Sequence, residues 1–234
     1  MISFLIFLFL FGLLFIDCMI PLFKAYFARE GFNAYGSYFG NILLIVSRGC
    51  VAIYLPLSAY LVQEGVSGDD LSKIYSLSLL SICIVSFFLS FKINKFRRVF
   101  NFILKLLFKF FPKFNKPKVK DQKILNSDEI REKNKNYKLF FFIVLIAAFI
   151  NSLGITLPMT LAAKYASNSL VFSQIGPFIN CLGTLLWTLI IEGYLSFAYE
   201  NTNQDPSLVF FITGRLFIYR SFGYLFALLF LTYI

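Results

Sequence analysis

Residues 40–57 read GNILLIVSRGCVAIYLPL, an apolar run with one charged residue, Arg48, near its middle. With its flanks the run covers residues 35–62, and a helix of roughly 20 apolar residues is long enough to cross a bilayer. An arginine at the centre of such a helix costs roughly 2.5–3.5 kcal/mol on insertion scales. A charge of that cost usually faces a polar cavity or a partner, so Arg48 is a candidate functional residue.

The composition of the whole chain is that of a membrane protein. Of its 234 residues, 59% are hydrophobic and 15% are charged, whereas soluble domains have roughly 45–50% apolar and about 25% charged residues. Five further stretches are long and apolar enough to span a bilayer, at residues 2–23, 71–91, 139–163, 170–191 and 208–234. The first lacks the basic start and cleavage site of a signal peptide. The sequence therefore predicts an all-α, polytopic membrane protein with about six transmembrane helices.

A strongly basic loop separates the third span from the fourth. Residues 92–138 contain 15 Lys or Arg and four Asp or Glu. Such an excess marks the cytoplasmic side, which puts both termini outside and leaves Lys164 at an outer end. The chain thus divides into a first bundle of three helices (1–91), the basic cytoplasmic loop (92–138) and a second bundle of three helices (139–234).

The first part of this loop, VFNFILKLLFKFFPKF at residues 99–114, is amphipathic and basic. A helix of that kind lies flat on anionic membrane lipids. The alternative is that the block only orients the neighbouring spans, and the two interpretations are compatible. Lysine-rich loops beside spans are far more often orientation signals than nucleic-acid sites, so we expect no nucleic-acid partner.

The second span carries polar and small residues at helical spacing. Asn41, Leu44 and Arg48 fall on one face because they are three or four residues apart. Gly36 and Gly40 form a small-xxx-small pair, which lets another helix approach closely. This face therefore combines close packing with a polar ladder that ends in a charge.

Other polar positions lie inside the remaining spans. We expect Asn180 and Glu192 of the fifth span, Asp17 of the first and Arg215 and Arg220 of the last to share a cavity with Arg48. Three arginines and two acids leave one positive charge, which suits a diphosphate because its oxygens accept the forked guanidinium donors. Asp17 is a possible partner of Arg48 or Arg215, and Glu192 of Arg215. The alternative is an internally paired structural cluster with Arg220 near solvent.

Several kinds of chemistry are not supported by the sequence. The chain has no His, which excludes imidazole bases and His-ligated metals. Its four cysteines are far apart and form no CxxC pair. We therefore expect no metal, no cofactor and no enzymatic activity.

Four patches of the chain resemble the Amj-type alternate lipid II flippases. They are GNILLIVSRG followed by Pro56 and Leu57, the run SQIGPFINCLGTLLWTLIIEG, the pair Gly214-Arg215 with Gly223, and LPMTLAAKYA. Asn180, Thr184 and Leu185 fall at matching places in the second patch. The family's arginine in the last span corresponds to Arg215 or to Arg220.

The resemblance implies a flippase that moves the undecaprenyl-diphosphate-linked peptidoglycan precursor across the cytoplasmic membrane. In that interpretation Arg48, Arg215, Asn41, Asn180, Glu192, Arg220 and Asp17 bind the substrate. Three other functions remain open at this point: a membrane enzyme acting on lipid diphosphates or acyl donors, a transporter of another solute, and a non-transporting envelope scaffold. An enzyme would need a base or an acidic metal cluster, and Asp17, Glu64 and Glu192 lie on different segments.

Overall fold

The protein is a bundle of membrane-spanning helices. A computed structural model describes residues 1–29, 32–96, 102, 137–201 and 206–234. Within these residues there is no strand, and six helices are long and apolar enough to cross a bilayer. The expected all-α, multi-pass membrane architecture is confirmed, while the expected amphipathic helix at 99–114 lies almost entirely outside the described residues.

The helices follow one another along the chain with short connections. The long helices are α1 (Ile2–Arg29), α2 (Asn33–Gln63), α3 (Gly68–Lys92), α6 (Tyr137–Lys164), α7 (Ser169–Leu185) and α9 (Pro206–Tyr233). The shorter segments are two 3₁₀ turns, Ile93–Phe96 and Ala166–Asn168, a π-helical segment η3 (Leu186–Glu192) and α8 (Gly193–Asn201).

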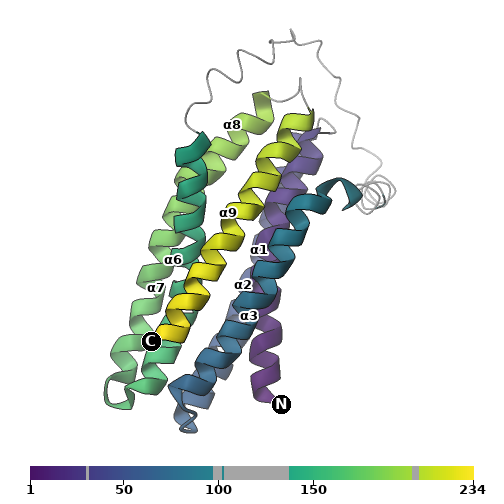
Figure 1. The fold of residues 1–234 in the computed structure, drawn as a ribbon. Coiled ribbons are helices and arrows are strands. Elements are labelled where there is room, and N and C mark those ends of the chain that lie inside the picture. The colour runs from purple at the N-terminus through teal and green to yellow at the C-terminus, as the bar shows by residue number, and fades with distance from the viewer. Residues whose placement is uncertain (30–31, 97–101, 103–136, 202–205) are drawn as a thin grey trace.

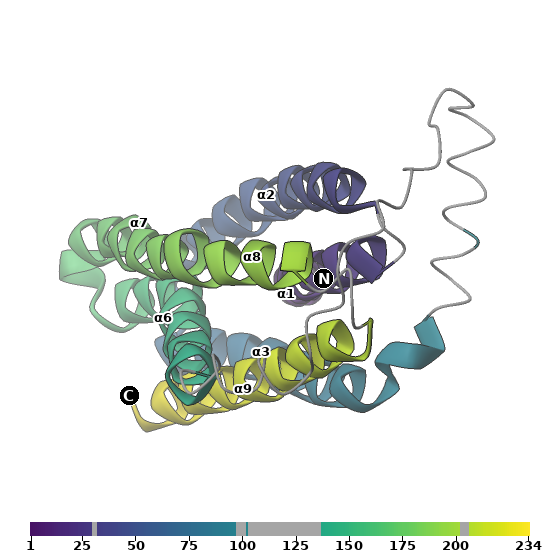
Figure 2. The same ribbon diagram turned by 90° about the horizontal axis from the view of Figure 1, so that it is seen from above.

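The long helices form three pairs. α1 packs on α2, α6 packs on α7, and α3 packs on α9. The α3–α9 pair joins the other two, because α3 also contacts α1 and α9 also contacts α6. Seen from above, α2 and α7 lie on the same side of the bundle, away from α3 and α9 (Figure 2). Both termini lie at the end opposite to the start of α6, as the predicted topology requires (Figure 1).

Side chains of α3 donate hydrogen bonds to the backbone of α9. Ser86 Oγ donates to the carbonyl of Phe217 at 3.1 Å, and Ser72 Oγ donates to that of Leu231 at 3.1 Å. In lipid there is little hydrophobic drive between helices, so packing and such bonds hold them together. These contacts fix the register of the pair that joins the other two pairs.

Glycines let the helices of the other two pairs approach closely. A Cβ at Gly36 would lie 3.1 Å from Cβ of Phe27 on α1, and a Cβ at Gly154 would lie 2.7 Å from the backbone nitrogen of Asn180 on α7. The predicted close approach at Gly36 and Gly40 therefore occurs, against α1. The equally tight contact between α6 and α7 was not predicted.

Two helices are longer than the sequence predicts. α1 continues to Arg29 instead of ending at residue 23, and the fifth span runs over Ala166–Tyr199 through the π-helical segment.

Lys164, which the predicted topology places unfavourably at an outer end, donates from Nζ to the carbonyl oxygen of Ile234. That bond gives its ammonium a partner at the edge of the bundle.

Candidate functional site

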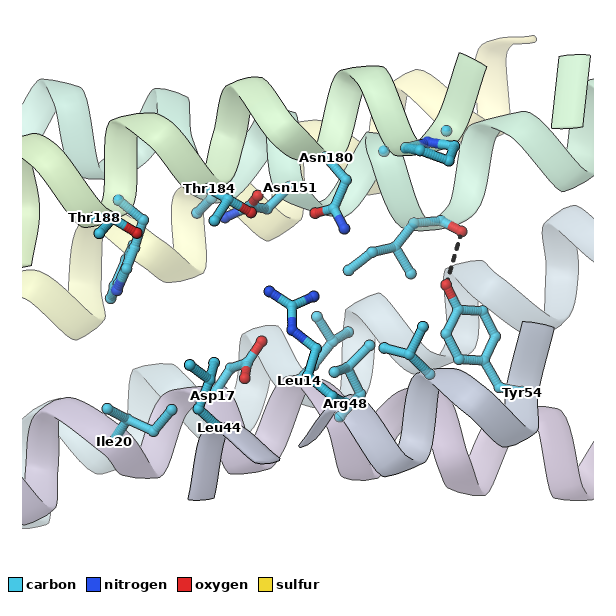
Figure 3. A pocket seen from close by; sticks show the side chains of 18 of the residues that line it. Leu14, Asp17, Ile20, Leu44, Arg48, Tyr54, Asn151, Asn180, Thr184 and Thr188 are labelled. Atoms are coloured by element: carbon cyan, nitrogen blue, oxygen red, sulfur yellow. Dashed lines mark hydrogen bonds between the residues drawn. The ribbon is translucent and has the colours of Figure 1, made fainter. Parts of the chain in front are cut away.

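A cavity of about 560 Å³ lies inside the bundle, between the α1–α2 pair and the α6–α7 pair. Residues of α9 also line it. Figure 3 shows Asp17 and Arg48 on one wall and Asn151, Asn180 and Thr184 on the opposite wall. Its polar and charged lining consists of Asp17, Lys24, Asn41, Arg48, Tyr54, Asn151, Ser173, Asn180, Thr184, Trp187, Thr188, Glu192, Arg220 and Tyr224.

Arg48 is the cationic group of this cavity that has no hydrogen-bond or ion-pair partner in the described part of the chain. Asn41, Leu44 and Arg48 all line the cavity, as their spacing on α2 predicts. Among the described residues, Arg48 makes no hydrogen bond and no ion pair. Its forked donors are therefore available to a ligand.

Asp17 lies beside Arg48 on the same wall (Figure 3). One carboxylate oxygen, Oδ1, is buried and has no hydrogen-bond partner. The expected ion pair between Asp17 and Arg48 is absent from the described part of the chain. An acid and an arginine thus face the same space without satisfying each other.

Arg220 is buried and fully engaged. Its Nε donates to the hydroxyl of Tyr224 at 2.6 Å, and its Nη1 donates to the backbone carbonyl of Asp17 at 2.9 Å. Its guanidinium carbon also lies 4.6 Å from the centre of the Trp187 ring, a cation–π contact. The alternative that placed Arg220 near solvent is wrong, and this residue holds α9 against α1 and the fifth span.

The opposite wall carries neutral polar groups. Asn180, Thr184 and Thr188 follow at four-residue intervals on the fifth span, and Asn151 of α6 lies on the same wall beside them. Oδ1 of Asn151 is buried without a hydrogen-bond partner. Amides and hydroxyls on this wall can donate to an anion or accept from a sugar.

Different contacts bridge the helices toward the two ends of the cavity. Tyr54 donates from its hydroxyl to the carbonyl of Ile155 at 3.4 Å, which links α2 to α6 (Figure 3). At the other end, Lys24 of α1 forms an ion pair with Glu192, which also accepts from Nε1 of Trp187 at 3.2 Å. The suggested pairing of Glu192 with Arg215 is wrong.

The charged residues that line the cavity have a positive balance. Lys24, Arg48 and Arg220 oppose Asp17 and Glu192, which leaves one positive charge when all five are ionised. The sequence predicted this balance with a different set of residues. The sequence did not predict Lys24 as a cavity residue, because the first span was expected to end at residue 23. A basic residue directly after an apolar run could have indicated that the helix continues.

Arg215 is not among the cavity residues. Its side chain is exposed and lies over the ring of Phe211, with its guanidinium carbon 5.4 Å from the ring centre. The other six predicted residues, Asp17, Asn41, Arg48, Asn180, Glu192 and Arg220, all line the cavity. The sequence did not predict Asn151 and Trp187 as cavity residues. An Asn inside an apolar span could have indicated Asn151.

The described residues contain no group of His, Cys, Asp and Glu side chains that could hold a metal ion. Comparison with protein-family models, with curated proteins and with solved structures found no match. The fold and the cavity therefore define a class only: a multi-pass membrane protein with a polar, cationic cavity between its helices.

Proposed function

We propose that this protein moves an anionic, lipid-linked precursor, of the undecaprenyl-diphosphate peptidoglycan type, from the inner to the outer leaflet of the bacterial cytoplasmic membrane. The observation that carries the proposal is the guanidinium of Arg48, which has no partner among the described residues and lies in a cavity whose lining has a positive balance. A guanidinium binds the oxygens of a diphosphate bidentately. Within the bilayer such a group is costly unless it serves a ligand or a partner.

The shape of the bundle suits a substrate with a long apolar tail. In the most apolar window of each span, 17% of the residues are buried in the α2 span and 17% in the fifth span, against 33% to 56% in the other four. Both spans line the cavity, and α2 and α7 lie on the same side of the bundle (Figure 2). The tail would stay in lipid beside them while the headgroup enters between them.

The polar wall suits the rest of the headgroup. The Asn and Thr side chains of the fifth span, with Asn151, face Arg48 across the cavity. Such groups bind the hydroxyl and amide groups of an amino sugar or peptide. Movement of the precursor across the membrane requires no covalent bond to be made or broken, so we propose a transporter and not an enzyme.

The test is complementation in bacteria depleted of their main lipid II flippase. Wild type should restore growth, and Arg48→Ala at equal membrane abundance should not. Arg215→Ala is the matched comparison, since it removes an intramembrane arginine that lies outside the cavity, and its loss should be much smaller. Failure of a well-expressed wild type to restore growth would reject lipid II as the substrate, and equal losses in both variants would reject the cavity as its path.

A further inference from the structure

Asp17 is the acidic group of the cavity that lacks a cationic partner. The other acid, Glu192, is paired with Lys24. Asp17 makes no ion pair among the described residues, and its Oδ1 is buried with no hydrogen-bond donor. A buried carboxylate with an unsatisfied oxygen and no ion pair is unfavourable, so its ionised form depends on the charges around it.

The charged and titratable groups near Asp17 come from two other helices. α2 contributes Arg48 and the thiol of Cys50, together with the hydroxyl of Ser47, and α9 contributes Arg220 and the hydroxyl of Tyr224. Arg220 already donates to Tyr224 and to the carbonyl oxygen of Asp17, not to the carboxylate. Arg48 is the neighbouring cation with unused donors, and it is also the group that our proposed function assigns to the anionic headgroup.

We propose that binding of an anionic diphosphate headgroup in this cavity is coupled to uptake of one proton by Asp17, an inference that rests on the proposed function. The headgroup and the ionised Asp17 compete for the positive charge of Arg48. When the headgroup occupies that charge, an ionised Asp17 faces a second negative group at close range, which favours its neutral form. The proton comes from water in the cavity and adds to a carboxylate oxygen, and it leaves when the headgroup leaves.

The protonated carboxyl also changes from an acceptor to a donor. It can then donate to an oxygen of the bound diphosphate, so proton and headgroup stabilise each other. Because such coupling is reciprocal, a proton that favours headgroup binding must itself be bound more tightly when the headgroup is present. A transport cycle with this property carries a proton with each headgroup.

The experiment measures proton uptake directly. The probe is a short-chain polyprenyl diphospho-sugar, whose diphosphate is esterified at both ends and keeps a constant charge. Its binding to the purified full chain in detergent is followed by calorimetry in two buffers with different ionisation enthalpies. Wild type should take up close to one proton per probe bound, and Asp17→Asn should bind the probe with no uptake. Wild-type binding without uptake at any pH, or unchanged uptake in Asp17→Asn, would overturn the inference.

Glu64→Gln is the control variant, because Glu64 is an exposed acid at the C-terminal end of α2, outside the cavity. Its proton uptake should equal that of wild type, and a loss there would count against Asp17 as the site. If Asp17→Asn does not fold, the pH dependence of probe binding by wild type still tests the inference. Its affinity for the probe should fall by up to about tenfold per pH unit within the range of about pH 5 to 8, and constant affinity would overturn the inference. Absence of any probe binding by wild type would instead reject the proposed function, and this inference with it.

Discussion

Arg48 can be tested by a change that keeps its charge. Arg48→Lys retains a cation but loses the forked donors that bind two oxygens of a diphosphate. Losing one charge-assisted hydrogen bond, worth about 1.5–3 kcal/mol, should weaken headgroup binding about tenfold or more. Titration of the purified variant with the same diphospho-sugar measures this directly. Wild-type affinity in Arg48→Lys would show that the site needs only a positive charge.

The two arginines of the cavity should differ in what they stabilise. Arg220→Ala removes the donor to Tyr224 and to the carbonyl of Asp17 and leaves both acceptors buried. We expect a loss of about 1–3 kcal/mol in the free energy of unfolding, seen as a lower unfolding temperature in detergent. Arg48→Ala should leave that temperature near the wild-type value, because Arg48 makes no hydrogen bond among the described residues. Equal losses in both variants would contradict this division of roles.

Sequence spacing predicted correctly which residues share a face of α2, but it did not predict which face of α9 is turned toward the cavity. Asn41 and Arg48 share a face of α2 because the interval of seven residues is close to two helical turns. Arg215 and Arg220 are five residues apart, which places them about 140° apart around α9, so both cannot face one cavity. The sequence contains no signal for the rotation of α9, which is set by its packing on α3 and α6. That packing turns Arg220 inward and leaves Arg215 exposed.

Among the helices, the contact between α6 and α7 is the most sensitive to added volume. Gly154→Ala would put a Cβ 2.7 Å from the backbone nitrogen of Asn180, and a backbone atom cannot move aside as a flexible side chain can. The cost of such overpacking is typically about 1–3 kcal/mol, and the shift would displace Asn180 on the cavity wall. Unfolding in detergent and the complementation assay measure the two effects.

Gly193→Ala is the matched control for this change. Gly193 lies in a helical segment of the fifth span, and a Cβ there meets nothing within 4 Å. The same substitution should be neutral or slightly stabilising, because alanine favours a helix over glycine by about 1 kcal/mol. Equal destabilisation at both positions would indicate a helix-propensity effect and not a close contact.

Apolar patterning also could not predict the π-helical turn. Hydropathy predicted a span at 170–191 and located its centre correctly. The wider turn at Leu186–Glu192 arises from the backbone bonding pattern, which composition does not reveal. Such turns inside helices often occur at functional sites. Here the turn carries Trp187, Thr188 and Glu192, all of which line the cavity.

For the whole molecule, six spans could be predicted because each must be apolar over a bilayer thickness. The arrangement of the helices around a cavity could not, since many pairings of six apolar helices satisfy the same hydropathy. Glycine contacts and buried hydrogen bonds decide among those pairings. Gly36 of α2 packs closely against α1, and Ser86 of α3 donates to the backbone of α9. Asp17 and Glu192 could be recognised as candidates from the sequence, but Lys24 as the partner of Glu192 could not.

The proposed direction of transport depends on the orientation of the bundle in the membrane. If the basic loop lies in the cytoplasm, the Lys24–Glu192 pair lies toward the cytoplasmic end of the cavity and the Tyr54–Ile155 bond toward its outer end. A headgroup made in the cytoplasm would then reach Arg48 by way of the ion pair. The opposite orientation would have the substrate enter past Tyr54 and would contradict the proposed direction.

Cysteine labelling at the two ends of α3 tests this orientation. In a chain whose four native cysteines have been replaced, Glu64→Cys precedes α3 and Lys92→Cys ends it, and both positions are exposed. A membrane-impermeant thiol reagent should label Glu64→Cys in intact cells, and Lys92→Cys only after the membrane is opened, because the basic excess beside Lys92 is retained in the cytoplasm. The reverse pattern would place the ion pair at the outer surface, and the protein would then meet its substrate from outside.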